Sequence, residues 1–167
     1  MGKTFIRIDD RLIHGQIVVA WCGTLNIQEI IVIDNTTASN PMLKQIMTMG
    51  VPKAYKTEIV TLESSKELLE KEVTHNRLVI MRSPIDLPTI IPHIKDLDTL
   101  YLGNIQKNKD SIYNLSSGGG GVLFFSQKEV DILEDLYQKG INIVLQMVPQ
   151  SSKRTWEQAK KVFNNNK

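Results

Sequence analysis

The sequence predicts an α/β fold, a doubly wound and mostly parallel sheet with helices on both faces, in a single domain over residues 1–167. Short runs rich in Ile, Val and Leu alternate with longer helical stretches about five times along the chain. Several of the short runs are apolar without interruption, which is typical of strands covered on both faces. The length suits one domain, and no linker divides the chain.

Two strand–helix units are predicted in the first third of the chain. Phe5–Ile8 is the first strand, and a helix over Gly15–Cys22 follows it and closes near Gly23. Glu29–Asp34 is the second strand. The next helix covers residues 41–49, because Asn40 can cap it, Pro41 suits a first helical position and Gly50 ends it.

Three further strands are expected in the middle of the chain. Thr57–Leu62 is a short strand, and a polar amphipathic helix over residues 63–76 follows it. Leu78–Met81 is a buried strand, which leads into a helical stretch that runs through Ile94. Thr99–Leu102 is the fifth strand.

The last third begins with a less regular segment that contains the glycine run Gly118–Gly121. This run lacks the spacing of a phosphate-binding loop, so we interpret it as a turn between two β segments. A clear amphipathic helix covers Gln127–Gly140, and the strand Asn142–Val148 is stopped by Pro149. Residues 153–163 form a short terminal helix.

Composition excludes several classes of protein. The 20 Lys and Arg residues nearly balance the 18 Asp and Glu residues, so the net charge of +2 does not indicate a nucleic-acid binder. Cys22 is the single cysteine, which leaves no internal disulfide and no cysteine-based metal site. No apolar run approaches the roughly 18 residues of a membrane span, and the N-terminus does not resemble a signal peptide. We therefore expect a cytoplasmic protein.

The candidate site is the set of loops that follow the strands, because ligands of open α/β sheets bind at the carboxyl ends of the strands. These loops are Asp9–His14, Asp34–Asn40, Arg82–Pro84 and Gly103–Gln106.

The first of these loops carries the most chemistry. His14 directly precedes a helix, whose unpaired N–H groups and dipole favour phosphate. Gly15 permits close backbone approach, and Arg11 offers a planar fork of donors to phosphoryl oxygens. Asp9 or Asp10 could hold the imidazole tautomer through one ring nitrogen while the other reacts. The alternative is a structural loop with solvated charges and an incidental histidine.

Other constellations are weaker. His75 and His93 are dispersed, and without metal-ligand spacing they predict no metal site. The pair Asp9-Asp10 is also found in receiver domains, but the later strand ends in Arg82-Ser83 where those domains need an acceptor aspartate. The sequence has no GxGxxG motif after the first strand, so dinucleotide binding is not indicated.

The run Ile6–Gln16, IRIDDRLIHGQ, closely resembles the phosphorylation loop of the IIB component of the mannose/fructose/sorbose class of bacterial sugar phosphotransferase systems (PTS), also called the type-4 EIIB domain. LVIMRSP at 78–84, LYLGNI at 100–105 and KGINIVLQMVP at 139–149 resemble further segments of that family, in its order and spacing. The glycine-rich stretch at 116–121 departs from the family pattern and leaves the sixth strand open.

The resemblance implies a function. In this family the histidine that matches His14 takes a phosphoryl group on Nδ1 from a phosphohistidine of the IIA component. It then passes the group to a sugar that the membrane components IIC and IID import, and no cofactor or metal is needed. Arg11, Asp10, Gly15 and, less directly, Ser83 would stabilise the phosphoryl group, with Asp9 nearly as plausible as Asp10 for orienting the loop or ring. The protein would then be cytoplasmic and peripherally associated with the membrane transporter.

Two points stay open at this stage. One alternative is a non-catalytic sensor that binds a phosphate or phosphoprotein on the same fold. The other concerns docking, for which we expect a rim of cations near the carboxyl-edge loops. These cations are Arg7, Arg11, Arg82 and Lys107.

Overall fold

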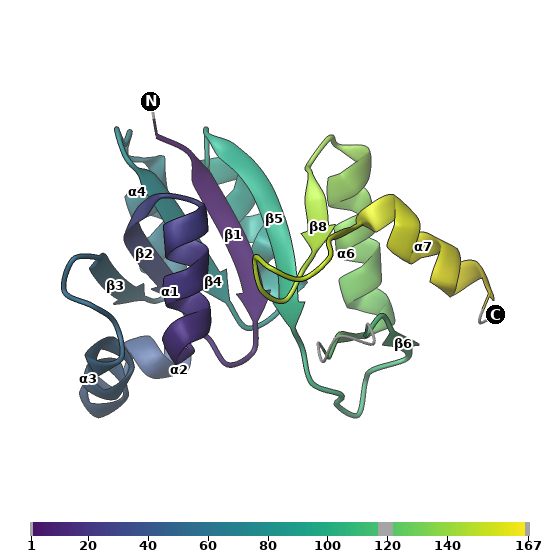
Figure 1. Ribbon diagram of the computed structural model, residues 1–167, viewed down its shortest axis with the longest axis horizontal. Helices are drawn as coiled ribbons and strands as arrows, with labels where there is room; N and C mark the ends of the chain where they lie inside the picture. The colour runs from purple at the N-terminus through teal and green to yellow at the C-terminus, as the bar shows by residue number, and fades with distance from the viewer. Residues whose placement is uncertain (1, 117–121, 166–167) are drawn as a thin grey trace.

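The computed structural model describes residues 2–116 and 122–165, and a seven-stranded sheet lies at its centre (Figure 1). The strand order is β3-β2-β4-β1-β5-β8-β9; every neighbouring pair is parallel except β8 and β9. The predicted mostly parallel sheet is therefore confirmed. The strands are β1 Thr4–Asp9, β2 Ile27–Ile33, β3 Lys56–Val60, β4 Asn76–Met81, β5 Leu97–Asn104, β8 Ile143–Leu145 and β9 Arg154–Thr155.

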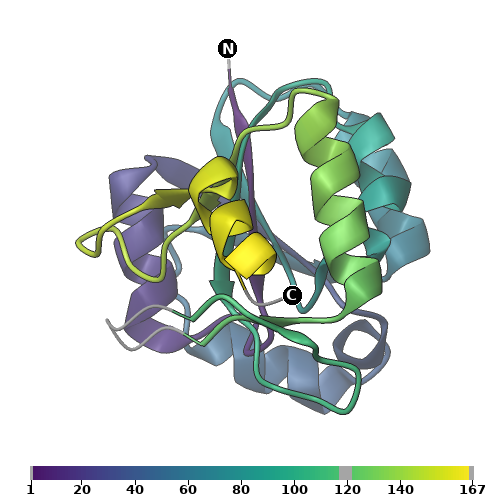
Figure 2. The same cartoon turned by 90° about the vertical axis from the view of Figure 1, so that its right-hand side faces the viewer.

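Helices cover both faces of the sheet, as predicted. Helix α1 lies on one face, and α4, α5 and α6 lie on the other (Figure 2). Helices α2 and α3 lie beyond the carboxyl end of β2, and α7 follows β9 at the far end of the sheet (Figure 1). The helices are α1 Gly15–Thr24, α2 Asn35–Ala38, α3 Pro41–Met49, α4 Leu62–Glu70, α5 Leu87–Ile90, α6 Gln127–Gln138 and α7 Trp156–Asn165.

Strand β1 shows how the two faces are filled. Ile6 and Ile8 belong to the larger apolar cluster, with residues of α4, α5 and α6, whereas Phe5 belongs to the cluster under α1. Because successive side chains of a strand point to opposite faces, Arg7 and Asp9 share the α1 side with Phe5. Both are almost fully buried, with 2% and 1% of their surface exposed. The last residues of β1 therefore place two charged side chains in the interior.

Two expected helices are wrong in extent. The helix predicted over 63–76 ends at Glu70, and the amide of Gly2 donates to the carbonyl of Val73 in the irregular stretch that follows. The stretch predicted as helical through Ile94 consists of three short pieces, the 3₁₀ turn Pro84–Asp86, α5 and the 3₁₀ turn Ile91–His93. A proline recurs every four residues there, and each lacks an N–H donor for a continuous helix. These prolines are Pro84, Pro88 and Pro92.

The irregular segment after β5 forms a second, two-stranded sheet. β6 (Tyr113–Asn114) pairs with β7 (Phe124–Phe125) in antiparallel orientation. The predicted turn at Gly118–Gly121 lies between them, outside the described residues. None of the helices in 2–116 and 122–165 combines the length and the apolar character that crossing a membrane requires.

Candidate active site

The loop that joins β1 to α1 lies at the carboxyl edge of the sheet. Strand β1 is flanked by β4 and β5, so the segments that follow these two strands border the loop on either side. In Figure 1 the arrowheads of all three strands point to this edge, at the bottom of the view. The topology thus places the predicted loops after β4 and β5 beside the loop that contains His14.

His14 is the N-cap residue of α1, and its side chain is exposed. It makes no capping hydrogen bond to the helix. The backbone before and after it is left-handed, with φ +59° at Leu12 and +40° at Gly15. A left-handed non-glycine residue costs of order 1–3 kcal/mol, and the burial of the Leu12 side chain in the α1-side core offsets that cost. The imidazole is therefore presented to solvent at the start of a ten-residue helix.

Asp9 binds Arg11 through both oxygens of its carboxylate. Its Oδ1 accepts hydrogen bonds from the backbone N and from Nε of Arg11, both at 3.0 Å, and its Oδ2 accepts from Arg11 Nη2 at 3.0 Å. The Asp9 carboxylate is buried, whereas 29% of the Arg11 side chain is exposed. This two-point contact fixes the plane of the guanidinium, and Nη1 is not among the atoms that Asp9 engages.

Asp10 ties the loop to the end of β5. Its two carboxylate oxygens accept from Asn104 Nδ2 at 3.0 Å and from the backbone N of Gln106 at 2.7 Å. Its own backbone N donates to the carbonyl of Asn104 at 2.9 Å. These contacts direct the Asp10 carboxylate toward the end of β5. A role of Asp10 toward the ring or the phosphoryl group stays a prediction.

Arg82 ties the same loop to the segment after β2. Its Nη1 donates to the carbonyl of Asp10 at 2.6 Å, and its Nε donates to Oδ1 of Asp34 at 3.2 Å. Burial of Asp34 opposes its ionisation, but hydrogen bonds from Thr37 and the charge of Arg82 outweigh this and lower the pKa of Asp34 below its usual value. Arg82 is thus a brace as well as an exposed cation.

Ser83 lies beside Arg82 in the wall of a polar cavity of about 260 Å³ that Asp34 and Asp86 also line. Its Oγ accepts from the backbone N of Ile85 at 3.4 Å and so caps the 3₁₀ turn. A role of Ser83 toward a phosphoryl group stays a prediction.

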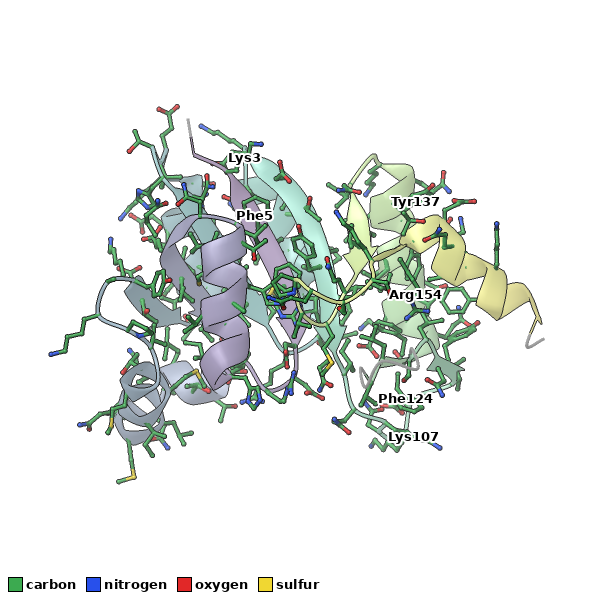
Figure 3. All side chains as sticks on the ribbon, viewed as in Figure 1. Lys3, Phe5, Lys107, Phe124, Tyr137 and Arg154 are labelled. Atoms are coloured by element: carbon green, nitrogen blue, oxygen red, sulfur yellow. The ribbon has the colours of Figure 1, made fainter. Side chains whose placement is uncertain are left out.

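The predicted rim of cations is partly wrong. Arg7 is buried, since the alternation of β1 turns it into the interior, where it is paired with Asp9. Lys107 is exposed on the stretch that follows β5, below the strand ends in Figure 3. Arg11 and Arg82 retain exposed surface at this edge.

The other two histidines lie at the opposite edge. His75 precedes β4, and its Nε2 is 3.4 Å from Oε1 of the buried Glu29. His93 precedes β5, and its Nδ1 is 2.7 Å from Oε1 of Glu70. In the described ranges, His, Cys, Asp and Glu form no group of three or more that could hold a metal ion.

Two site residues were missing from the sequence-based set. Asn104 and Asp34 each follow a strand, in loops that were selected for inspection, but neither was assigned a contact with the first loop. Their position after a strand was the available signal. The strand order decides that Asn104 reaches the first loop directly, through Asp10, and that Asp34 reaches it only through Arg82.

The geometry defines a class of protein: an α/β domain with an exposed histidine at a helix N-terminus, in a loop that the segments after β4 and β5 hold on either side. Over residues 3–167 the chain matches the family model described as "PTS system sorbose subfamily IIB component", and it belongs to this family.

Comparisons with individual proteins indicate the same family. The chain is 34% identical over 104 residues to a "Probable phosphotransferase enzyme IIB component" of Streptococcus pyogenes serotype M6, covering 61% of this chain and 64% of the relative. It is 22% identical over 146 residues to the mannose-specific EIIAB component of Escherichia coli K12, covering 85% of this chain and 43% of that protein. The chain therefore spans less than two thirds of either relative. The crystal structure of the IIBSor domain of the Klebsiella pneumoniae sorbose permease has the same fold, with a TM-score of 0.85 at 20% identity over 100% of this chain and 99% of that one.

Proposed function

We propose that the chain is a phosphoryl carrier of a sugar-importing PTS, with His14 as the residue that carries the phosphoryl group. The donor would be a phosphohistidine of a IIA component, and the acceptor would be a sugar held by the membrane components IIC and IID. The activity is then that of a protein-Nπ-phosphohistidine–sugar phosphotransferase at the cytoplasmic side of a transporter. The observation that carries the proposal is the exposed imidazole at the N-terminus of α1.

Two nucleophilic displacements make up the proposed reaction. The lone pair of His14 Nδ1 attacks the donor phosphorus, and the P–N bond to the donor imidazole breaks as that nitrogen takes back its electron pair. A sugar hydroxyl oxygen then attacks the phosphorus on His14. The hydroxyl proton passes to solvent water as the new O–P bond forms, and Nδ1 recovers its lone pair when the N–P bond breaks.

The residues around His14 suit this chemistry, because phosphoryl transfer depends mainly on positioning and on neutralising charge. The first-turn N–H groups of α1 and the helix dipole favour an anion next to His14. The partly exposed guanidinium of Arg11 is oriented by Asp9 beforehand, so little reorganisation is needed when the phosphoryl group arrives. This chemistry needs no metal ion.

The relation to a IIA partner is supported by a relative that is named an EIIAB component, in which the similar region occupies less than half of the protein. The name of that protein joins an A and a B component, which supports a IIA donor for this chain.

Sugar phosphorylation in membrane vesicles that contain IIC and IID tests the proposal. His14→Ala should abolish phosphate transfer from phospho-IIA to the sugar, while circular dichroism shows an intact fold, since exposed loop substitutions usually change stability by about 0.5 kcal/mol or less. His75→Ala and His93→Ala are the matched controls and should transfer normally. Full transfer by the His14→Ala variant would refute the assignment, and reversible phosphoprotein binding without any transfer would favour a sensor.

A further inference from the structure

Arg7 is a buried cation that the proposed reaction does not use. It lies on β1 between the sheet and α1, and its Cζ is 5.0 Å from the centroid of the Trp21 ring. Its Nη1 donates to the carbonyl of Gln146 at 3.0 Å, and its Nη2 donates to the carbonyl of Met147 at 2.7 Å. The same Nη2 lies 3.5 Å from Oδ2 of Asp9. Its charge is therefore shared between the β8–β9 connection and the start of the His14 loop.

Two further features, a hydrogen bond of Trp21 and the space left by Gly103, hold Arg7 in one place. Trp21 donates its indole N–H to the carbonyl of Met147 at 3.0 Å, so one carbonyl joins α1, β1 and the β8–β9 connection. In Figure 1 this connection passes in front of β1 and β5, beside α1. Gly103 on β5 leaves the space that the guanidinium fills, since a Cβ there would lie 2.3 Å from Arg7 Nη2.

Asp9 links Arg7 to the candidate site. Its carboxylate is buried with Arg7 on one side and Arg11 on the other, and it accepts three hydrogen bonds from Arg11. A buried carboxylate keeps a fixed orientation only while its charge is balanced. Burial lowers the pKa of Arg7 to about 10 against the opposing charge of Asp9, so Arg7 remains charged at neutral pH.

We propose that Arg7 is a positioning residue for phosphoryl transfer: through Asp9 it holds Arg11 and the loop that presents His14, using the β8–β9 connection as its support. The proposal rests on the proposed function of His14. It implies that residues 146–147, far from His14 in the sequence, are part of the structure that sets the transfer geometry.

Arg7→Lys tests this, with Arg77→Lys as the matched control. Arg77 is also buried in the sheet, but it binds Thr4 and the carbonyls of Leu68 and Leu69, away from the His14 loop. A lysine cannot donate to two carbonyls in a plane, face Asp9 and cover the Trp21 ring at once. We expect kcat for transfer from phospho-IIA to fall about 10²-fold in Arg7→Lys, as for a displacement of about 1 Å at a reacting group, with KM nearly unchanged. Arg77→Lys should keep the kcat of wild type per folded molecule.

A second readout does not depend on transfer. The NMR resonance of Arg11 Nε–H should shift in Arg7→Lys and stay in place in Arg77→Lys. If Arg7→Lys does not fold, Trp21→Phe removes one donor to Met147 and should shift the same resonance. If wild type accepts no phosphate, the proposed function fails, while the NMR comparison still decides whether Arg7 holds Arg11 in place. Equal kcat for the two lysine variants, or an unmoved Arg11 resonance, would overturn the proposal.

Discussion

The parallel sheet buries one arginine toward each of its ends, and the two differ in what they hold. Arg77, at the amino end of β4, donates to Thr4 Oγ1 at 2.7 Å and to the carbonyl of Leu69 at 2.7 Å, where it neutralises the C-terminal end of α4. Arg7, toward the carboxyl end of β1, is likewise satisfied by main-chain carbonyls. Each arginine also faces a carboxylate, but Asp96 beside Arg77 binds Thr4, whereas Asp9 beside Arg7 binds Arg11 in the loop that contains His14.

The comparison separates stability from function. Both arginines remove the penalty of a buried charge with nearby acceptors, so loss of either should destabilise the fold. Only the contacts of Arg7 continue, through a carboxylate, into a loop with an exposed histidine. At the amino end, His75 and His93 meet carboxylates within 3.4 Å, whereas at the carboxyl end the carboxylates of Asp9 and Asp10 bind other groups of the loop and its neighbours.

Apart from the loss of His14 itself, the largest effect is expected at Arg11. Arg11→Lys should slow transfer on the order of 10²–10³-fold, by analogy with the loss of one preorganised donor, because lysine cannot engage both oxygens of Asp9 and still present a donor in the plane. Rapid-quench measurement of phosphate transfer, with urea unfolding as the check on the fold, would show this. A transfer rate equal to that of wild type would mean that backbone N–H groups stabilise the phosphoryl group alone.

The next largest difference in transfer rate is expected between variants of two aspartates, one at the carboxyl end of the sheet and one at its amino end. Asp10→Ala removes the side-chain contacts of the loop with Asn104 and Gln106 and should slow transfer on the order of 10-fold to 10²-fold. Asp96 accepts from Thr4 at 2.8 Å and lies 3.6 Å from Arg77. Asp96→Ala should cost about 1–3 kcal/mol of unfolding free energy and leave the transfer rate of the folded protein unchanged. If both variants slow transfer equally, the two ends are not functionally distinct.

Reversing the charge of a lysine should have a smaller effect on the kinetics of transfer, and this effect should differ between the two edges of the sheet. Lys107→Glu should raise the KM for phospho-IIA severalfold, whereas Lys95→Glu, before β5, should not, because charges near a docking site accelerate association. The effect of Lys107→Glu should fade between about 50 and 500 mM salt, as the Debye length shortens. Kinetics indifferent to salt would indicate that partners contact apolar surface, such as the exposed Met42, Ile46 and Met49 of α3.

The smallest expected effect is a pH dependence of stability at Asp34. Because its folded-state pKa is below its ordinary value of 3.8, its carboxylate contributes stability that is fully present above about pH 4 and is lost as the pH falls through the folded pKa. The difference in unfolding free energy between wild type and Asp34→Asn should therefore shrink in acid. Asp110→Asn, at an exposed position, serves as the control. A difference in unfolding free energy that stays constant down to pH 2 would show that the charge of Asp34 does not contribute to stability.

Much of this fold follows from local patterns. The uninterrupted apolar runs mark β2 and β4, and the capping residues around α3 mark both of its ends, since these signals lie within the element itself. The loop with His14 was identified from its place between a strand and a helix.

Longer-range contacts could not be predicted in this way. Arg7 was expected at the surface, because it lies near a predicted carboxyl-edge loop, and its acceptors on Gln146 and Met147 lie 139 and 140 residues away. The ties of Asp10 to Asn104 and of Arg82 to Asp34 depend on the order of strands in the sheet, which periodicity does not specify.

Locating the phosphate tests the central claim most directly. Wild-type protein, phosphorylated through the upstream PTS proteins and digested under alkaline conditions, should yield one acid-labile phosphate per chain, in the peptide that contains His14 at the carboxyl edge. A phosphate on the peptide of His75 or His93, at the amino edge, would contradict the account.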